Sequence, residues 1–331
     1  THDKPRIVSC AELTASHIGL PRGCLDVAID LITSSGITVE LDDRRSRGAE
    51  IEVAFNGMLR PGQEDAVAAL LPHDIGVLAA TTAFGKTVVA AKLIAARGVN
   101  VLVLVHRRQL MDQWVERLSA FLDMAPGTIG KIGGGKRKPS GLIDIALIQS
   151  LVRKGEVDDI IGDYGHLIVD ECHHLSAVSF ELVARRAKSR YVLGLSATVT
   201  RKDGHHPIIF MQCGPVRKRV DARAEAARRP FDHHVRIRQT TFRLPGSEAT
   251  AATVPIQDVY RALAGDDDRN ALIFNDVLAA LEAGRSPVVI TERTDHLEAM
   301  ADRLSRFAKN VIVLRGGQSE RKRREAIDRL A

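Results

Sequence analysis

The sequence is poor in aromatic residues, in cysteine motifs and in long apolar runs. Aromatic residues make up 4% of the 331 residues, so platforms that stack many nucleic-acid bases are not expected. The four cysteines are scattered without a Cys-x-x-Cys pair, which indicates neither a zinc site nor a disulfide framework. No apolar run reaches the roughly 18 residues of a membrane span, and no signal peptide opens the chain. We therefore expect a cytoplasmic protein with reduced thiols and no membrane partner.

The remaining composition is that of an ordinary globular protein. Hydrophobic residues make up 45% and charged residues 27% of a length that suggests about two domains. The net charge of +6 is a mild indication of a polyanionic partner. Residues 201–243 concentrate this charge, with eleven Lys and Arg against four Asp and Glu.

A phosphate-binding loop is predicted at residues 80–87, Ala-Thr-Thr-Ala-Phe-Gly-Lys-Thr, between an apolar run and a helix-forming stretch. Gly85 lets the backbone approach a phosphate, Lys86 can reach the β- and γ-phosphates, and the Thr87 hydroxyl can bind Mg²⁺. Ala80 stands where the motif usually has its first glycine, a position that needs a small residue. The loop residues predicted to bind ATP are Thr82, Ala83, Phe84, Gly85, Lys86 and Thr87.

Two further strands end in candidate site residues. The apolar stretch 165–169 ends at Asp170 and Glu171, and the stretch 191–195 ends at Ser196-Ala197-Thr198. Asp170 would hold Mg²⁺ together with Thr87, and Glu171 would orient the attacking water. Functional groups of an open α/β sheet lie at the carboxyl ends of its strands, so the arrangement predicts an ATPase site. Its predicted catalytic residues are Lys86, Asp170 and Glu171.

The order of elements predicts an α/β protein with a parallel sheet wrapped by helices in residues 55–235. Expected strands are 99–105, 143–148, 165–169 and 191–195. Residues 109–121 are expected to form an amphipathic helix whose apolar face carries Leu110, Trp114, Leu118 and Phe121. Residues 1–54 are expected to form a small module, a helix near 25–32 followed by a hairpin of strands 37–41 and 50–55. A second α/β pattern fills 236–331, with helices 271–281, 295–307 and 319–330 and strands 287–291 and 311–314.

The order of residues 80–87, 170–173 and 196–198 resembles the DExH branch of superfamily 2 helicases and translocases. Residues 59–63 are similar to the family motif whose Gln reads adenine, while 105–110 and 146–151 are similar to its strand-contacting motifs. Residues 200–204 and 213–216 resemble the XPB-type and restriction-translocase-type members, and the leading module resembles that of XPB-type helicases. The narrowest resemblance is to the helicase module of primase-polymerase proteins in bacterial conflict systems.

The resemblance implies a first RecA-like domain over 55–235 and an incomplete second RecA-like domain over 236–331. It implies ATP and Mg²⁺ as cofactors and nucleic acid as partner, with DNA favoured over RNA; oligomeric state is left open. It adds Arg60 and Gln63 to the residues expected to bind ATP. It also implies that His173, Ser196 and Thr198 couple the nucleotide state to movement of the protein. Candidate nucleic-acid contacts are Arg107, Arg108, Gln149, Arg201 and Arg315.

The family's arginines that reach across the cleft have no counterpart here, so we expect the 331-residue chain alone to hydrolyse ATP slowly. Arg321, Arg323 and Arg324 are interpreted as a solvated helix face. Alternative functions are a nucleic-acid-binding module without ATPase activity and the translocating subunit of a restriction system. The pairs His205-His206 and His233-His234 lack the spacing of metal ligands, so no metal site is predicted there. The basic loop 133–138 could bind a nucleic-acid phosphate or could equally be a solvated loop.

Overall fold

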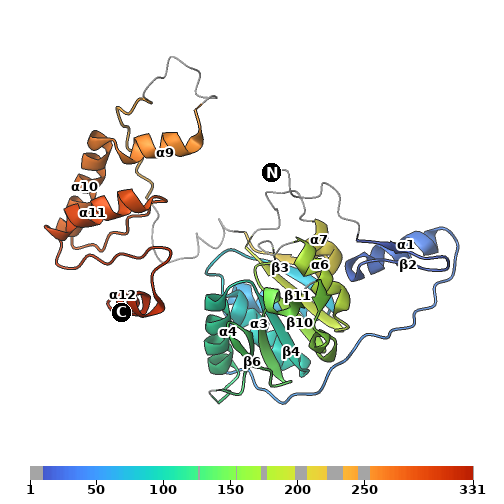
Figure 1. The fold of residues 1–331 in the computed structure, drawn as a ribbon. Helices are drawn as coiled ribbons and strands as arrows, with labels where there is room; N and C mark the ends of the chain where they lie inside the picture. The colour runs from blue at the N-terminus through green and yellow to red at the C-terminus, as the bar shows by residue number, and fades with distance from the viewer. Residues whose placement is uncertain are drawn as a thin grey trace. The chain divides into compact units, whose positions relative to one another are not determined.

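The structure is a computed structural model that describes residues 10–125, 127–153, 155–172, 177–197, 207–221, 234–244 and 254–330. The chain separates into two compact units, Thr1–Phe231 and Asp232–Ala331, and each is described by itself (Figure 1). The crossover that we predicted near residues 226–231 lies outside the described residues.

The first unit is built on a sheet that, within the described residues, has eight strands. All neighbouring strands are parallel except the last pair, so the predicted parallel α/β sheet is confirmed (Figure 1). The order across the sheet is β12 (Val216–Arg219), β3 (Ile75–Ala79), β11 (Tyr191–Ser196), β10 (His166–Val169), β4 (Val101–Val105), β7 (Ile143–Leu147), β5 (Gly130–Gly133) and β6 (Lys136–Lys138).

Helices cover both faces of this sheet because its central strands are apolar on both sides. Alternate strand residues contribute to two separate cores: Leu78 packs in one and its neighbour Val77 in the other. The first core also contains buried residues of α2 (Pro61–Leu70), α3 (Lys86–Arg97) and α4 (Arg108–Phe121), and the second contains residues of α5 (Ile148–Leu151), α6 (Ala177–Arg186) and α7 (Pro207–Cys213). The predicted strands of this unit and the helix 109–121 are confirmed to within two residues.

The leading segment departs from the prediction in one respect. Its helix is present as α1 (Leu25–Ser34), but 37–41 and 50–55 form no strands, so the expected hairpin is wrong. The backbone of this segment bonds instead to the sheet unit: Ser46 N, between the two predicted strands, donates to Lys188 O at 2.7 Å, and Ile51 N, in the second predicted strand, donates to Gly98 O at 2.9 Å. Further short elements are β1 (Glu12–Leu13), β2 (Ile18–Gly19), η1 (Arg22–Cys24), β8 (Val152–Arg153), β9 (Glu156–Val157) and η2 (Asp159–Asp163).

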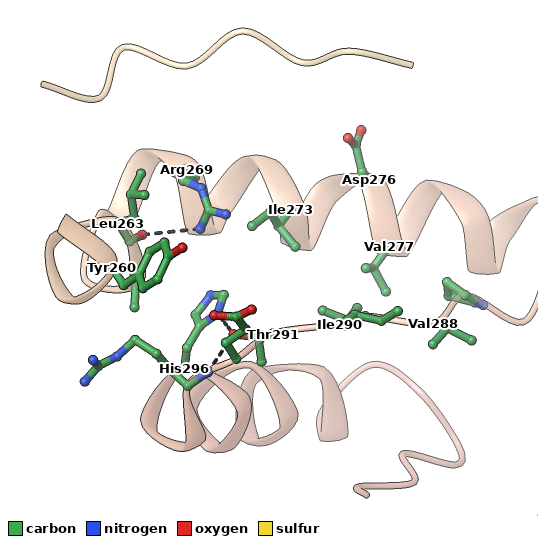
Figure 2. A pocket seen from close by; sticks show the side chains of 15 residues that line it. Tyr260, Leu263, Arg269, Ile273, Asp276, Val277, Val288, Ile290, Thr291 and His296 are labelled. Atoms are coloured by element: carbon green, nitrogen blue, oxygen red, sulfur yellow. Dashed lines mark hydrogen bonds between the residues drawn. The ribbon is translucent and has the colours of Figure 1, made fainter. Parts of the chain in front are cut away.

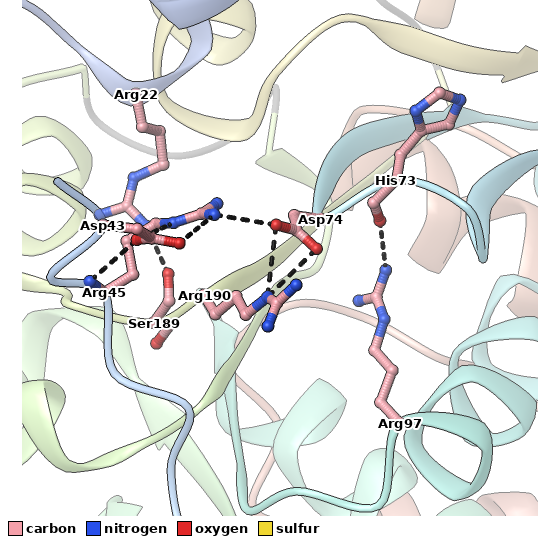
Figure 3. Close-up of polar contacts among 8 residues, drawn as sticks. All are labelled: Arg22, Asp43, Arg45, His73, Asp74, Arg97, Ser189 and Arg190. Atoms are coloured by element: carbon pink, nitrogen blue, oxygen red, sulfur yellow. Dashed lines mark hydrogen bonds and ion pairs between the residues drawn. The ribbon is translucent and has the colours of Figure 1, made fainter. Parts of the chain in front are cut away.

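Polar contacts attach the leading segment to the sheet unit (Figure 3). The Arg22 guanidinium donates to Ala184 O at 2.8 Å and to Ser189 O at 3.3 Å, which satisfies carbonyls at and beyond the end of α6. Arg45 forms an ion pair with Asp74 at 3.0 Å, just before β3. The segment is therefore held at the edge of the sheet where the parallel strands begin.

The second unit contains α9 (Ile256–Ala264), α10 (Asp267–Glu282), α11 (Thr294–Ser305) and α12 (Glu320–Asp328). The last three confirm the predicted helices. The predicted strands 287–291 and 311–314 are wrong, since neither segment is a strand in the structure. A strand needs a hydrogen-bonding neighbour, and no strand pairing is found among the described residues of this unit.

An open groove of about 630 Å³ lies where the predicted strand 287–291 runs (Figure 2). Apolar side chains of α10, such as Ile273 and Val277, line it together with Val288 and Ile290. At one end the His296 ring bonds to the Thr291 hydroxyl at 2.9 Å. That bond ties α11 to the extended segment without a sheet.

Candidate nucleotide site

The predicted phosphate-binding loop joins β3 to the N-terminus of α3. Gly85 is the residue before the helix and has a φ of 91°, in the left-handed region that favours glycine. A Cβ added there would lie 2.4 Å from Nε2 of Gln63, so a side chain at this position would also have to displace the Gln63 amide. The first backbone N–H groups of α3 and the positive end of its dipole are available to an anion at this loop.

Lys86 is the first residue of α3, and its ammonium lies across the loop. Nζ is 3.2 Å from Glu171 Oε1 and also donates to Ala80 O at 3.2 Å. Glu171 follows β10 and has a φ of 48°, so its side chain reaches Lys86 from an unusual backbone conformation. The structure thus brings together two residues 85 positions apart that the sequence assigned to one site.

Asp170 lies next to this pair and is almost completely buried. Its Oδ2 accepts a hydrogen bond from Trp114 Nε1 at 2.7 Å, and its Oδ1 accepts one from the backbone N of Glu171 at 3.0 Å. Burial raises the pKa of Asp170, and the indole hydrogen bond opposes that effect. Thr87 is also buried, and its hydroxyl accepts from Arg117 Nη1 at 3.5 Å. Carboxylate and hydroxyl oxygens are ligands that suit Mg²⁺, so the donor chemistry fits this ion.

Arg60 and Gln63 contact the loop through its backbone. Gln63 Nε2 donates to Phe84 O at 2.8 Å, and the Arg60 guanidinium donates to the same oxygen. Gln63 Oε1 accepts from the backbone N of Arg60 at 2.9 Å, which forms the side-chain half of a capping box at the start of α2; the backbone N of Gln63 donates to the Arg60 carbonyl oxygen at 2.8 Å. Both polar atoms of the Gln63 amide are therefore engaged within the protein.

Ser196 ends β11 beside the loop, where Ala80 N donates to its carbonyl oxygen at 2.9 Å. The strand that carries Ser196 and the strand that leads to the loop are thereby joined at their carboxyl ends. His173 and Thr198 lie outside the described residues, and the coupling role of all three stays a prediction.

The candidate nucleic-acid contacts are found in separate places. Arg107 and Arg108 are exposed where β4 passes into α4, and Gln149 Nε2 lies 3.4 Å from His106 O, which brings the two predicted motifs together. Arg315 is in the second unit and forms an ion pair with Glu298. Arg201 lies outside the described residues.

The basic segment 133–138 is part of a hairpin, since Lys136–Lys138 forms β6 against β5. The expectation of a loop there is corrected, because an antiparallel partner was not visible in the sequence. Arg321, Arg323 and Arg324 are exposed on α12, as predicted. Among the described residues, no three His, Cys, Asp or Glu side chains form a metal-binding group, and no helix is long and apolar enough to span a membrane. His205, His206 and His233 fall outside those ranges.

Residues 56–201 match the family model for "Type III restriction enzyme, res subunit". The chain is 36% identical over 165 residues to DNA 3'-5' translocase XPB2 of Sulfurisphaera tokodaii. The aligned region covers 49% of this chain and 36% of that protein. The chain is 31% identical to Putative ATP-dependent RNA helicase L396 of Acanthamoeba polyphaga mimivirus, covering 50% and 32%. It is 30% identical to DNA 3'-5' helicase XPB of Kineococcus radiotolerans, covering 84% and 50%.

These matches confirm the predicted resemblance to superfamily 2 helicases and translocases of the XPB-like and type III restriction-type group. The chain spans about a third to a half of the length of these relatives. The narrower resemblance to primase-polymerase helicase modules stays a prediction.

Two residues near the acidic pair were not assigned to the site from the sequence. Trp114 was expected only as part of the apolar face of its helix, and Arg117 was not selected at all. The helical spacing predicts that Trp114 is buried, but the bond from its nitrogen to Asp170 depends on how α4 packs on the sheet, against β4 and β7. A polar contact of this kind has no local sequence signal.

Proposed function

We propose that this chain forms the nucleotide-binding part of an ATP-dependent helicase or translocase that acts on nucleic acid. The observation that carries the proposal is the Lys86 ammonium, held between Ala80 O and the Glu171 carboxylate at the N-terminus of α3. A terminal phosphate bound at this loop would form an ion pair with the Lys86 ammonium in place of Glu171. The carboxylate would then be released to accept a hydrogen bond from the attacking water.

The remaining site residues have complementary roles in the proposal. Thr87 and Asp170 would hold Mg²⁺, which supplies charge neutralisation on the phosphate oxygens. Arg60 and Gln63 support the loop through Phe84 O and lie where an adenine-reading motif is expected. The catalytic residues are Lys86 and Glu171, with Asp170 as metal ligand.

DNA is the proposed nucleic acid. Two of the relatives carry DNA in their names, although a third is named as an RNA helicase. Exposed Arg107 and Arg108, with Gln149 close to the same strand end, are suited to contact phosphates. Binding through phosphates should weaken steeply with salt, because cations are released from the nucleic acid.

The test pairs nucleotide binding with single-turnover hydrolysis at excess protein, because the 331-residue chain alone is expected to hydrolyse ATP slowly. Lys86→Ala should weaken binding of a fluorescent ATP analogue and abolish ATP turnover, because the ammonium that contacts the terminal phosphates is lost. Glu171→Gln should retain binding and lose hydrolysis, because only the charge that orients the water is removed. Lys92→Ala is the matched control: Lys92 is on the same helix, but its ammonium lies over the Phe55 ring, away from the loop.

Near-wild-type turnover of Lys86→Ala with an unchanged circular dichroism spectrum would contradict the site. Loss of binding in Glu171→Gln as large as in Lys86→Ala would show that Glu171 does not position the water. Salt-sensitive DNA binding by a wild-type chain that does not bind ATP would instead favour the nucleic-acid-binding module without ATPase activity.

A further inference from the structure

Trp114 contacts the candidate metal carboxylate directly. It is on α4, is 2% exposed and packs in the same core as Met111 and Leu118, one helical turn to either side. Its indole nitrogen is a donor with a single hydrogen, and that hydrogen is used on Asp170 Oδ2 at 2.7 Å. A buried ring of this size has little freedom to move, so the position of its N–H is set by the packing of the core.

The same helix also reaches the other proposed Mg²⁺ ligand. Arg117 is three residues after Trp114, so both side chains leave α4 on the same side. Arg117 Nη1 lies 3.5 Å from Thr87 Oγ1, while Trp114 bonds to Asp170. Helix α4 therefore contacts both the hydroxyl at the N-terminus of α3 and the carboxylate that follows β10.

The carboxylate of Asp170 is held at both oxygens. The backbone N of Glu171 donates to Oδ1 at 3.0 Å, and Trp114 donates to Oδ2. With one donor on each oxygen, rotation of the carboxylate about its last side-chain bond would break both hydrogen bonds. Removal of the indole N–H leaves only the hydrogen bond from the Glu171 backbone, so the carboxylate of Asp170 is free to rotate.

We propose that Trp114 is a positioning residue that fixes the orientation of Asp170 for Mg²⁺ binding. The inference rests on the proposed function, since it gives Trp114 a role toward the ion that this function requires. Partners that bond to metal ligands from behind typically change metal affinity by about 10- to 100-fold when they are removed. Trp114 acts through Asp170 and would not touch nucleotide or metal itself.

The first test compares Trp114→Phe with Met111→Leu, a volume-conserving change in the same core, one turn away. Metal binding is measured with Mn²⁺ in the presence of ADP by electron paramagnetic resonance. Binding of fluorescently labelled ADP without metal and thermal unfolding are measured in parallel. We expect Trp114→Phe to weaken Mn²⁺ about tenfold with metal-free ADP affinity unchanged, and Met111→Leu to leave both unchanged. Equal Mn²⁺ affinity of Trp114→Phe and wild type, with both folded, would overturn the proposal.

The second test does not depend on a tryptophan variant. Trp114 is the sole tryptophan of the chain, so the emission of the wild-type protein reports on this indole alone. Adding Mg²⁺ to the ADP complex should shift the emission, because a divalent charge arrives at the group that accepts the indole bond. Asp170→Ala should abolish this Mg²⁺-dependent shift while the emission itself remains.

An unchanged wild-type emission under conditions where Mn²⁺ binds the ADP complex would contradict the positioning role and leave the proposed function intact. A chain that binds neither ADP nor Mn²⁺ would refute the proposed function, and the role of Trp114 with it.

Discussion

Gln63 offers a test of whether the capping glutamine supports the phosphate loop or reads the base. The side chain is 4% exposed and makes two hydrogen bonds, from Arg60 N at 2.9 Å and to Phe84 O at 2.8 Å. Gln63→Met keeps the volume and removes both bonds. Each contributes about 1 kcal/mol, so the variant should be less stable by about 2 kcal/mol.

Gln63→Glu separates the two bonds. The introduced carboxylate can still accept from Arg60 N, and Glu is a favoured residue at this position of a capping box. It cannot donate to Phe84 O, and its buried carboxylate would face that carbonyl oxygen, so Gln63→Glu should destabilise the fold by at least as much as Gln63→Met. Gln113→Met, the same substitution at an exposed position of α4, should change stability by less than about 0.5 kcal/mol.

Urea unfolding measures these differences, and ligand binding decides the role. If Gln63 supports the loop, Gln63→Met weakens binding of ADP and of tripolyphosphate by a similar factor, about fivefold for 1 kcal/mol. Tripolyphosphate has no base, so unchanged tripolyphosphate affinity together with weaker ADP binding would refute loop support. The base-reading role implied by the family resemblance would then be favoured.

Three further predictions concern buried polar groups and the loop glycine. Gly85→Ala should lower nucleotide affinity more than tenfold, because its φ is 91° and a Cβ would lie 2.4 Å from the glutamine amide; Gly36→Ala, with a φ of 79° and open space, is the control for backbone strain alone. His166 is fully buried, and this burial lowers the pKa of its ring well below the 6.5 of a free histidine. The positive charge of Arg97 lowers the pKa further. The neutral form of His166 stabilises the fold above pH 6.5, so urea midpoints should fall as the pH drops below 6.5, and His166→Asn should flatten that dependence; equal profiles would contradict this assignment. Tyr164→Phe removes the hydroxyl that donates to buried Asp144 at 2.6 Å and should reduce stability by about 1.5–3 kcal/mol in urea unfolding, whereas an unchanged midpoint would mean that other donors suffice.

The sequence alone determined the parallel sheet and the residues at its carboxyl edge. Apolar runs such as 101–105 are buried on both faces and can be read directly as central strands. The loop before Lys86 and the acidic pair at 170–171 both follow such runs. Because the strands are parallel, their order alone predicts that both groups lie at the carboxyl edge of the sheet. The spacing of Trp114 with Leu110, Leu118 and Phe121 likewise predicted that it lies on the apolar face of its helix.

Only the tertiary structure decided which backbone and polar groups meet. Residues 37–41 and 50–55 have the pattern of a hairpin, yet Ile51 bonds to Gly98 of the sheet unit and not to the segment 37–41. Residues 287–291 have strand composition, but a strand exists only where a second chain segment supplies its hydrogen bonds. The Lys86–Glu171 ion pair and the Trp114–Asp170 bond join residues far apart in the chain. Their distances depend on how whole helices and strands pack, and neither local propensity nor periodicity contains that information.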